Sequence, residues 1–322
     1  MSTRINNRLA SHARVVALLL LGVLLAPATA RAQGDGPRVM ALAPVGLNAV
    51  SVTYMPMSSN YNFAQDILIK GADINSDVWA FAYNRFFNVG GRMAEIWLVP
   101  VFGTVSGSVE LLPGVPPLIP GGVKVPQVDG WADPYVAFRI GLVGAPALKL
   151  PEFAKHKPGF QVYALLGANI PIGDYKSSRP VNLGTNRWAI RAGVPMVQAW
   201  ARPGKTTLLE VNPGFYFYTA NDDPYGPAEK RTQKPLFVVE SHLTQNLTPK
   251  FWVGGDLRYQ AGGETTTDSR ADDNVNNHAG GGFEVGYQIL RPLSFVAGWG
   301  KIFAESDGSR GDMWRFRLIM VF

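Results

Sequence analysis

The chain has 322 residues, with 30 basic and 24 acidic side chains, 35 glycines and 24 prolines. It contains no cysteine, which excludes a disulfide framework and a thiol nucleophile. Its mean hydropathy of +0.03 is too low for a protein built from transmembrane helices.

The first 32 residues have the pattern of a secretory signal peptide. Three arginines charge the start, an apolar run covers residues 15–25, and small residues precede a cut ahead of Gln33. The apolar run is too short for a spanning helix, which takes about 20 apolar residues. Removal of this leader leaves 26 basic side chains against 24 acidic ones. This near neutrality argues against nucleic acid as a partner.

Strand-like runs separated by turn residues fill the rest of the chain. Successive side chains of a strand point to opposite faces, and these runs alternate apolar with polar residues. The runs are long, whereas strands of soluble sheets average about 5 to 6 residues and tilted membrane strands need about 9 to 11. We expect twelve strands, at residues 45–57, 76–87, 91–108, 131–145, 158–172, 187–201, 204–220, 233–247, 249–263, 278–290, 292–304 and 311–322.

The connections between these runs alternate in length. Tight turns at residues 88–91, 202–205, 247–250 and 290–292 follow even-numbered strands, and longer polar connections follow odd-numbered ones. Residues 146–157 are the exception, because they form a long connection on the short-turn side. Short turns at one rim and long loops at the other are typical of outer-membrane barrels, whose short turns face the periplasm.

The predicted fold class is therefore all-β. It is a transmembrane, antiparallel, up-and-down β-barrel of about 12 strands, with short periplasmic turns and longer extracellular loops. A soluble sandwich would also alternate, but its strands would be shorter. The expected organisation is a signal peptide at residues 1–32, a short periplasmic N-terminal segment at 33–44 and the barrel at 45–322.

The last ten residues alternate without interruption. Arg315 and Arg317 fall on one face, and only apolar side chains fall on the other. This pattern resembles the terminal strand by which the barrel-assembly machinery recognises outer-membrane barrels. The residues of the expected assembly signal are Trp314, Phe316, Leu318, Met320 and Phe322.

Five short blocks after Trp131 resemble a known family. Together and in this order they are similar to outer-membrane proteins of the phenol meta-cleavage degradation pathway family, whereas residues 33–130 share only the strand pattern. The resemblance implies an outer-membrane barrel linked to the uptake of hydrophobic or aromatic compounds, and it implies no catalytic residues. The blocks are Ala132-Asp133-Pro134-Tyr135, residues 144–148 (GAPAL), 183–189 (LGTNRWA), 221–223 (NDD) and 262–268 (GGETTTD).

Charged residues gather on the face that we assign to the lumen. Such a wall can line an aqueous path, or it can lock the strands together through cross-wall pairs. Glu240 and His242 lie two apart on one strand and would suit a general base, but no nucleophile accompanies them and a structural pair is favoured. We therefore predict no catalytic residue, no cofactor and no metal site. The candidate lumen residues are Arg85, Glu95, Arg139, Arg191, Glu210, Glu240, His242, Asp256, Arg258, Glu284, Arg315 and Arg317.

Aromatic residues are spread over many of the expected strands. Tyrosine and tryptophan form girdles at the two membrane interfaces of such barrels, which is the favoured interpretation. Contact of some of them with an aromatic solute in the lumen is the open alternative. The residues are Tyr54, Tyr83, Trp97, Tyr135, Trp188, Trp252, Tyr259, Trp299 and Trp314.

These observations favour a barrel of the bacterial outer membrane that passes a small hydrophobic or aromatic compound. A non-transporting structural or surface-interaction protein is the second hypothesis, and an outer-membrane hydrolase is the third. The expected partners are outer-membrane lipid and lipopolysaccharide, the barrel-assembly machinery and the solute, without nucleic acid. Twelve strands lie between side-chain-filled barrels of eight and open ones of sixteen, so a narrow or plugged path is expected.

Overall fold

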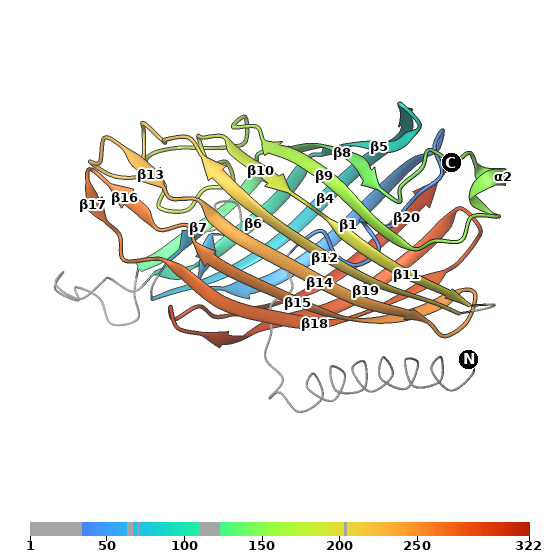
Figure 1. The fold of residues 1–322 in the computed structure, drawn as a ribbon. Helices are drawn as coiled ribbons and strands as arrows, with labels where there is room; N and C mark the ends of the chain where they lie inside the picture. The colour runs from blue at the N-terminus through green and yellow to red at the C-terminus, as the bar shows by residue number, and fades with distance from the viewer. Residues whose placement is uncertain (1–33, 63–66, 70, 110–122, 203–204) are drawn as a thin grey trace.

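Twelve antiparallel strand positions close into one barrel (Figure 1). The computed structural model describes residues 34–62, 67–69, 71–109, 123–202 and 205–322. Neighbours in sequence are neighbours in the barrel. β1 (Asn48–Ser59) closes it by pairing with both β4 (Ala72–Val89) and β20 (Gly311–Val321). The predicted fold class and the predicted number of strands are confirmed.

Three of the twelve positions hold two shorter strands each. The breaks fall at Pro100, at Pro134 and at Pro195, because proline has no N–H to donate to a ladder. The divided positions are β5 (Arg92–Val99) with β6 (Val101–Val109), β7 (Val123–Trp131) with β8 (Tyr135–Val143), and β10 (Ala189–Gly193) with β11 (Met196–Arg202). The undivided ones are β9 (Phe160–Asn169), β12 (Lys205–Tyr218), β14 (Leu236–Asn246), β15 (Phe251–Gly262), β18 (Asn276–Gln288) and β19 (Leu293–Glu305).

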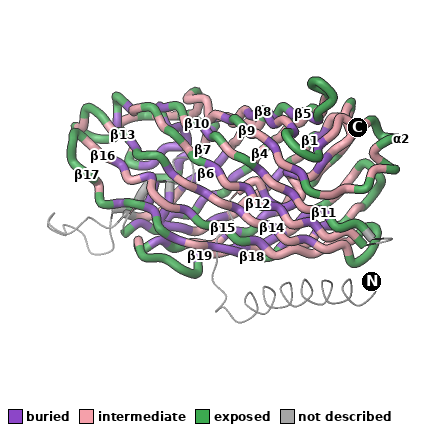
Figure 2. The backbone as a smooth tube through the Cα atoms, in the orientation of Figure 1, coloured by how far each residue is buried: buried purple, intermediate pink, exposed green. Residues whose placement is uncertain are grey.

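Burial alternates along the strands as the sequence pattern predicts (Figure 2). On β14, every second residue from Leu236 to Thr244 is buried, and the residues between them are half-buried. The outward face is apolar, with Leu257 45% and Phe283 52% exposed. An apolar outer face with a polar interior suits a barrel in lipid, where the closed ladder satisfies the backbone groups.

The two ends of the barrel differ (Figure 1). One end carries the short turns, the chain terminus after β20 and α2 (Leu150–Phe153), which lies in the long connection after β8. Within the described ranges, no helix is both long and apolar enough to cross a bilayer. The other end carries the long connections, with short hairpin strands at β2 (Tyr61–Asn62), β3 (Ile67–Leu68), β13 (Arg231–Gln233), β16 (Thr265–Thr267) and β17 (Arg270–Ala271).

Candidate functional site

Residues 34–42, the described stretch well ahead of β1, lie inside the barrel. We name residues 34–42 the inner segment. Residues 33–44 were predicted to form a short periplasmic segment, but residues 34–42 are bound by side chains of the barrel interior. The prediction was wrong because the charged wall supplies partners for the backbone groups of the segment, as water would outside.

The base of the inner segment is held by Glu210 and Arg139. The Glu210 carboxylate accepts the backbone N–H of Arg38 at 2.5 Å and that of Met40 at 3.0 Å. Arg139 donates from Nη1 to the Met40 carbonyl oxygen at 2.6 Å and from Nη2 to Glu95 at 2.5 Å. Met40 is fully buried and packs in an apolar cluster of the lumen. The base therefore has both polar and apolar anchors.

The tip of the inner segment is held by charged groups. Arg191 Nη1 lies 3.0 and 2.8 Å from the two carboxylate oxygens of Asp35. The backbone N–H of Asp35 donates to Glu240 at 3.1 Å, and Arg317 donates to the Asp35 carbonyl oxygen at 2.9 Å. A Cβ at Gly34 would lie 1.9 Å from Glu240 Oε1, so a larger residue there would displace this carboxylate from its present position.

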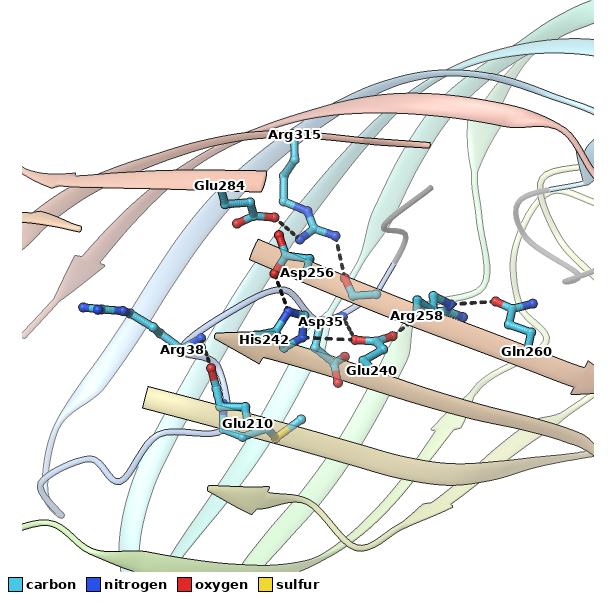
Figure 3. A network of polar contacts seen from close by, with 12 residues as sticks. Asp35, Arg38, Glu210, Glu240, His242, Asp256, Arg258, Gln260, Glu284 and Arg315 are labelled. Carbon is cyan, nitrogen blue, oxygen red and sulfur yellow. Dashed lines mark hydrogen bonds and ion pairs between the residues drawn. The ribbon is translucent and has the colours of Figure 1, made fainter. Parts of the chain in front are cut away.

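The remaining wall charges form a chain of pairs beside the tip (Figure 3). His242 Nδ1 lies 2.6 Å from Asp256, and His242 Nε2 lies 3.7 Å from Glu240. Arg258 pairs with the same Glu240 carboxylate. In the next part of the wall, Arg315 donates to Glu284 at 2.6 Å and to the Gly34 carbonyl oxygen at 2.9 Å. Buried charges are tolerated only when they are paired, which explains the dense network.

The contacts of Glu240 and His242 decide between a general base and a structural polar pair. Both ring nitrogens of His242 face carboxylates, so the ring joins two acids across the lumen wall. A general base needs one nitrogen directed at a nucleophile or a substrate proton. The arrangement therefore has the character of a structural polar pair.

Eleven of the twelve candidate lumen residues point into the barrel. Arg139, Glu210 and Arg315 are among its most deeply buried side chains. Arg258 lines the lumen with a little more exposure than its neighbours. The eleven are Glu95, Arg139, Arg191, Glu210, Glu240, His242, Asp256, Arg258, Glu284, Arg315 and Arg317.

Arg85 is the residue that sequence analysis assigned to the wrong face. On β4 the lumen face comprises the even-numbered residues, such as Ala82 and Asn84, and Arg85 is exposed on the outer face. Its Nη1 donates to Asn48 Oδ1 at 3.0 Å, at the end of the barrel that carries the short turns. An arginine on the lipid side destabilises a barrel by only about 0 to 1 kcal/mol near an interface. The charge of Arg85 therefore does not indicate which face of the strand it occupies.

The aromatic residues divide between the two faces. Tyr83, Trp188, Tyr259 and Trp314 are exposed on the outside of the barrel. The other group faces the lumen, where contact with an aromatic solute stays a prediction, as the girdle does for the outward group. The lumen group is Trp97, Tyr135 and Trp252.

Two cavities lie in the lumen, one on each side of the tip of the inner segment. The inner cavity, of about 610 Å³, reaches the short-turn end at Lys250 and Val321. The outer cavity, of about 250 Å³, extends toward the long loops at Asp133. Both are lined by Gly34 and Asp35, so the tip stands at their boundary.

The loop of residues 173–188 folds over the outer mouth of the barrel, and three of the five family-like blocks, 132–135, 183–189 and 221–223, meet there. Asp133 accepts hydrogen bonds from the backbone N–H of Gly173 and from the backbone N–H of Thr185, each at 2.9 Å. Asn186 donates to Asn221 at 2.9 Å. Leu183 of the same loop is fully buried against the inner face of the wall. The blocks therefore hold the loop of residues 173–188 in place.

A second loop is fastened at the same end. The Tyr61 hydroxyl lies 2.8 Å from Asn276 Oδ1, 3.1 Å from His278 Nδ1 and 2.6 Å from Ser309 Oγ. Asp307 lies 3.0 Å from the same His278 nitrogen. Burial alone would raise the pKa of Asp307, but hydrogen bonds from His278, Asn277 and Ser309 outweigh it and hold that pKa well below its usual range.

The parts of this site that come from the inner segment and the loops were not predicted from the sequence. Asp35 and Arg38 stand in a short stretch with no strand pattern, and nothing local indicates that this stretch enters the barrel. The wall itself gives no signal either, because its predicted acids and bases are nearly balanced in number. The block that contains Asp133 was noted for its family resemblance, but that resemblance assigned no role to Asp133.

Comparison with known proteins identifies the family of this chain. The family model described as "Putative MetA-pathway of phenol degradation" matches residues 59–318. The chain belongs to this family. It has the fold of the outer-membrane β-barrels, and its apolar outer face suits contact with lipid. A search of curated proteins gave no match.

Two solved structures share the fold of this family member. An outer membrane channel from Pseudomonas putida F1 matches with a TM-score of 0.71 at 18% identity, over 90% of this chain and 100% of that chain. The translocator domain of the autotransporter NalP from Neisseria meningitidis matches with a TM-score of 0.51 at 11% identity, over 98% of this chain and 97% of that chain. At these identities the likeness concerns the fold alone.

Proposed function

We propose that this barrel is an outer-membrane channel for small hydrophobic or aromatic compounds. The observation that carries the proposal is the pair of lumen cavities that meet at Gly34 and Asp35. Together they extend from the short-turn end toward the long loops. The name of the Pseudomonas putida relative, an outer membrane channel, supports the proposal.

The lining of the inner cavity favours a solute with apolar surface. Trp97, Val99 and Val296 contribute apolar side chains, and Ala80 and Ala82 leave room beside them. Transfer of apolar surface from water to such a wall is favourable by about 25 cal/mol per Å². Ligand sites of this kind combine an apolar lining with a few fixed polar groups.

The tip of the inner segment is the barrier in this path. It is held by ion pairs and hydrogen bonds of Asp35, whereas the base is also held by the buried Met40. A solute that crosses from one cavity to the other must displace the tip. We propose that the tip moves while the base stays anchored.

A structural or surface-interaction role is the competing function. The hydrogen bonds that fasten the long loops at Asp133 and Tyr61 favour it, because they give the outer surface a fixed shape. Outer-membrane lipid, lipopolysaccharide and the barrel-assembly machinery are proposed partners under either function. The two functions differ in one measurable property, which is the flux of solute.

The test is uptake by liposomes that contain the purified barrel. Radiolabelled toluene, 4-methylphenol and a sugar of similar mass would be supplied to loaded liposomes, to empty liposomes and to liposomes with heat-unfolded protein. We expect faster uptake of at least one aromatic compound than of the sugar, with folded protein only. Uptake equal to that of empty liposomes for every compound would reject the channel and favour the structural role.

A further inference from the structure

The outer cavity has one apolar wall that is rich in methionine. Met55 and Met57 of β1, Val78 of β4 and Val101 of β6 line it, and Met57 and Val78 are buried against each other. Methionine sulfur makes favourable contacts with aromatic rings and adapts to irregular shapes. This wall suits a flat ring.

The opposite wall carries two buried polar groups that lack partners. Tyr135 of β8 reaches across Gly167 of β9, where a Cβ would lie 2.2 Å from its hydroxyl oxygen. Its hydroxyl thereby comes next to the guanidinium of Arg191 on β10. By hydrogen-bond geometry neither the Tyr135 hydroxyl nor Arg191 Nε has a well-aligned partner among the described residues, and the only group that the hydroxyl approaches is the Arg191 guanidinium itself. Such groups are rare in native structures and call for a partner.

Both unpaired groups can donate to an oxygen atom. Tyrosine O–H and arginine Nε–H are donors, and they stand side by side on the wall of the outer cavity. The two arginines of this cavity are already neutralised, because Asp35 pairs with Arg191 and Glu240 pairs with Arg258, and Asp133 adds a further negative charge to the lining. A neutral oxygen therefore fits this wall better than a carboxylate, which would add an uncompensated charge.

The volume limits the rest of the ligand. An apolar cavity of about 150 Å³ holds benzene, so one of about 250 Å³ has room for one ring with small substituents. A long acyl chain would not fit in it. The cavity thus combines a ring-sized apolar space with a site for one oxygen.

We propose that the outer cavity binds a single-ring compound with one neutral oxygen acceptor, a hydroxyl or a carbonyl. The oxygen accepts from Tyr135 and from Arg191 Nε, and the ring lies on Met55 and Met57. This inference rests on the proposed function, because it assigns a class of solute to the channel. It adds a selectivity that a merely apolar path would not have.

The test is a titration of methyl-labelled methionine by nuclear magnetic resonance, with the full-length barrel in lipid nanodiscs. The ligands are 4-methylphenol, toluene and 4-methylbenzoate, and the variants Met55→Leu and Met57→Leu assign the two reporter signals. We expect 4-methylphenol to shift both signals and to bind about tenfold more tightly than toluene, which matches the loss of one hydrogen bond. The benzoate should bind more weakly than 4-methylphenol.

Two isosteric variants sharpen this test. Tyr135→Phe removes only the hydroxyl and should reduce the preference for 4-methylphenol over toluene to about twofold or less. Tyr163→Phe is the matched control, because its hydroxyl bonds Gln161 outside the outer cavity, and it should keep the full preference. Equal affinity of the two ligands for the wild type, or shifts that spare Met55 and Met57, would overturn the inference. These measurements use the wild type and stay decisive if Tyr135→Phe does not fold.

The outcome separates this inference from the proposed function. Liposome uptake of both aromatic compounds without any preference in binding would overturn the inference and leave the channel standing. Binding with the expected preference but no uptake would reject the channel and keep the site.

Discussion

Arg191 on the barrel wall binds Asp35 of the inner segment through a single nitrogen, Nη1, which lies within 3.0 Å of both carboxylate oxygens. Arg191 is 5% and Asp35 15% exposed at the side chain, so the pair lies in a largely dry part of the lumen. Removing one partner of such a pair leaves a buried charge without compensation. The two residues therefore join the tip of the segment to the wall, at the boundary of the two cavities.

The first prediction concerns this pair. The variant Asp35→Asn should keep the shape of the tip while removing the charge that compensates Arg191. We expect higher single-channel conductance in planar bilayers, and a loss of about 3 kcal/mol in the free energy of unfolding. Asp77→Asn is the control, because Asp77 is exposed and hydrogen-bonded to Tyr54 on the outer face. Unchanged conductance in Asp35→Asn would show that the tip is not the barrier.

The second prediction concerns the base of the inner segment. Glu210→Ala removes the carboxylate that accepts the backbone N–H groups of Arg38 and Met40. Hydrogen bonds to charged groups contribute about 1.5 to 3 kcal/mol, so both amides should exchange about 10 to 100 times faster. Hydrogen exchange read by mass spectrometry would measure this. Asn212→Ala is the control, because Asn212 lies two residues away on the same face of β12. It should leave the exchange rates of both amides unchanged.

The third prediction concerns the two faces of β15. Leu257 is 45% exposed on the outer side, and an arginine there should cost about 2 to 4 kcal/mol if the site lies near the midplane. The neighbouring Arg258→Gln should also destabilise, because Arg258 compensates the buried Glu240. Urea unfolding in lipid vesicles would measure both. Adding Glu240→Gln to Arg258→Gln should recover much of its loss, whereas adding Glu240→Gln to Leu257→Arg should recover none, and equal recovery in the two would contradict the face assignment.

The strands were predictable because the alternation of apolar and polar residues repeats within each strand. The alternation of Val253, Leu257 and Tyr259 against Asp256 and Arg258 fixes both the strand and its faces. Arg85 shows where this evidence ends. It follows Asn84 near a rim, where two adjacent polar residues satisfy either assignment and the cost of an outward charge is small.

The inner segment could not be predicted from local pattern. Its conformation depends on Glu210, Arg139 and Arg191, which lie more than 90 residues away in sequence on three different strands. Contacts of that kind leave no periodic trace in the segment itself. The same holds for the contact of Asp133 with Thr185, which only the family resemblance marked, and without a role.

The fourth prediction concerns the pH dependence of the loop that Tyr61 fastens. Since the pKa of folded Asp307 lies below its unfolded value of about 4, its contribution to stability is complete above that value and fades as the pH falls through the folded pKa. Protection of the Tyr61 amide against hydrogen exchange should therefore be the same at pH 7 and pH 5, after correction for intrinsic rates. Asp307→Asn should lower it at both values. Loss of protection in the wild type between pH 7 and pH 5 would contradict this account.

The last prediction concerns the end of β20, where the barrel closes. Phe322 exchanges two backbone hydrogen bonds with Asn48, at 2.7 and 2.9 Å, while its side chain is 54% exposed. The ring therefore packs little against the barrel itself, and Phe322→Ala should lower the free energy of unfolding only as much as the loss of one outward phenylalanine does. If Phe322 belongs to an assembly signal, the same variant should nevertheless reduce the folded, heat-modifiable band in outer-membrane fractions.

A matched outward phenylalanine separates assembly from stability. Phe283→Ala removes a side chain of similar exposure, 52%, from the outer face of β18, away from the closing strand pair. It should lower the free energy of unfolding about as much as Phe322→Ala does, without reducing the folded fraction in cells. Equal loss of folded barrel from both variants would show that Phe322 contributes apolar surface like any other outward residue, and that the terminal strand is not read through it.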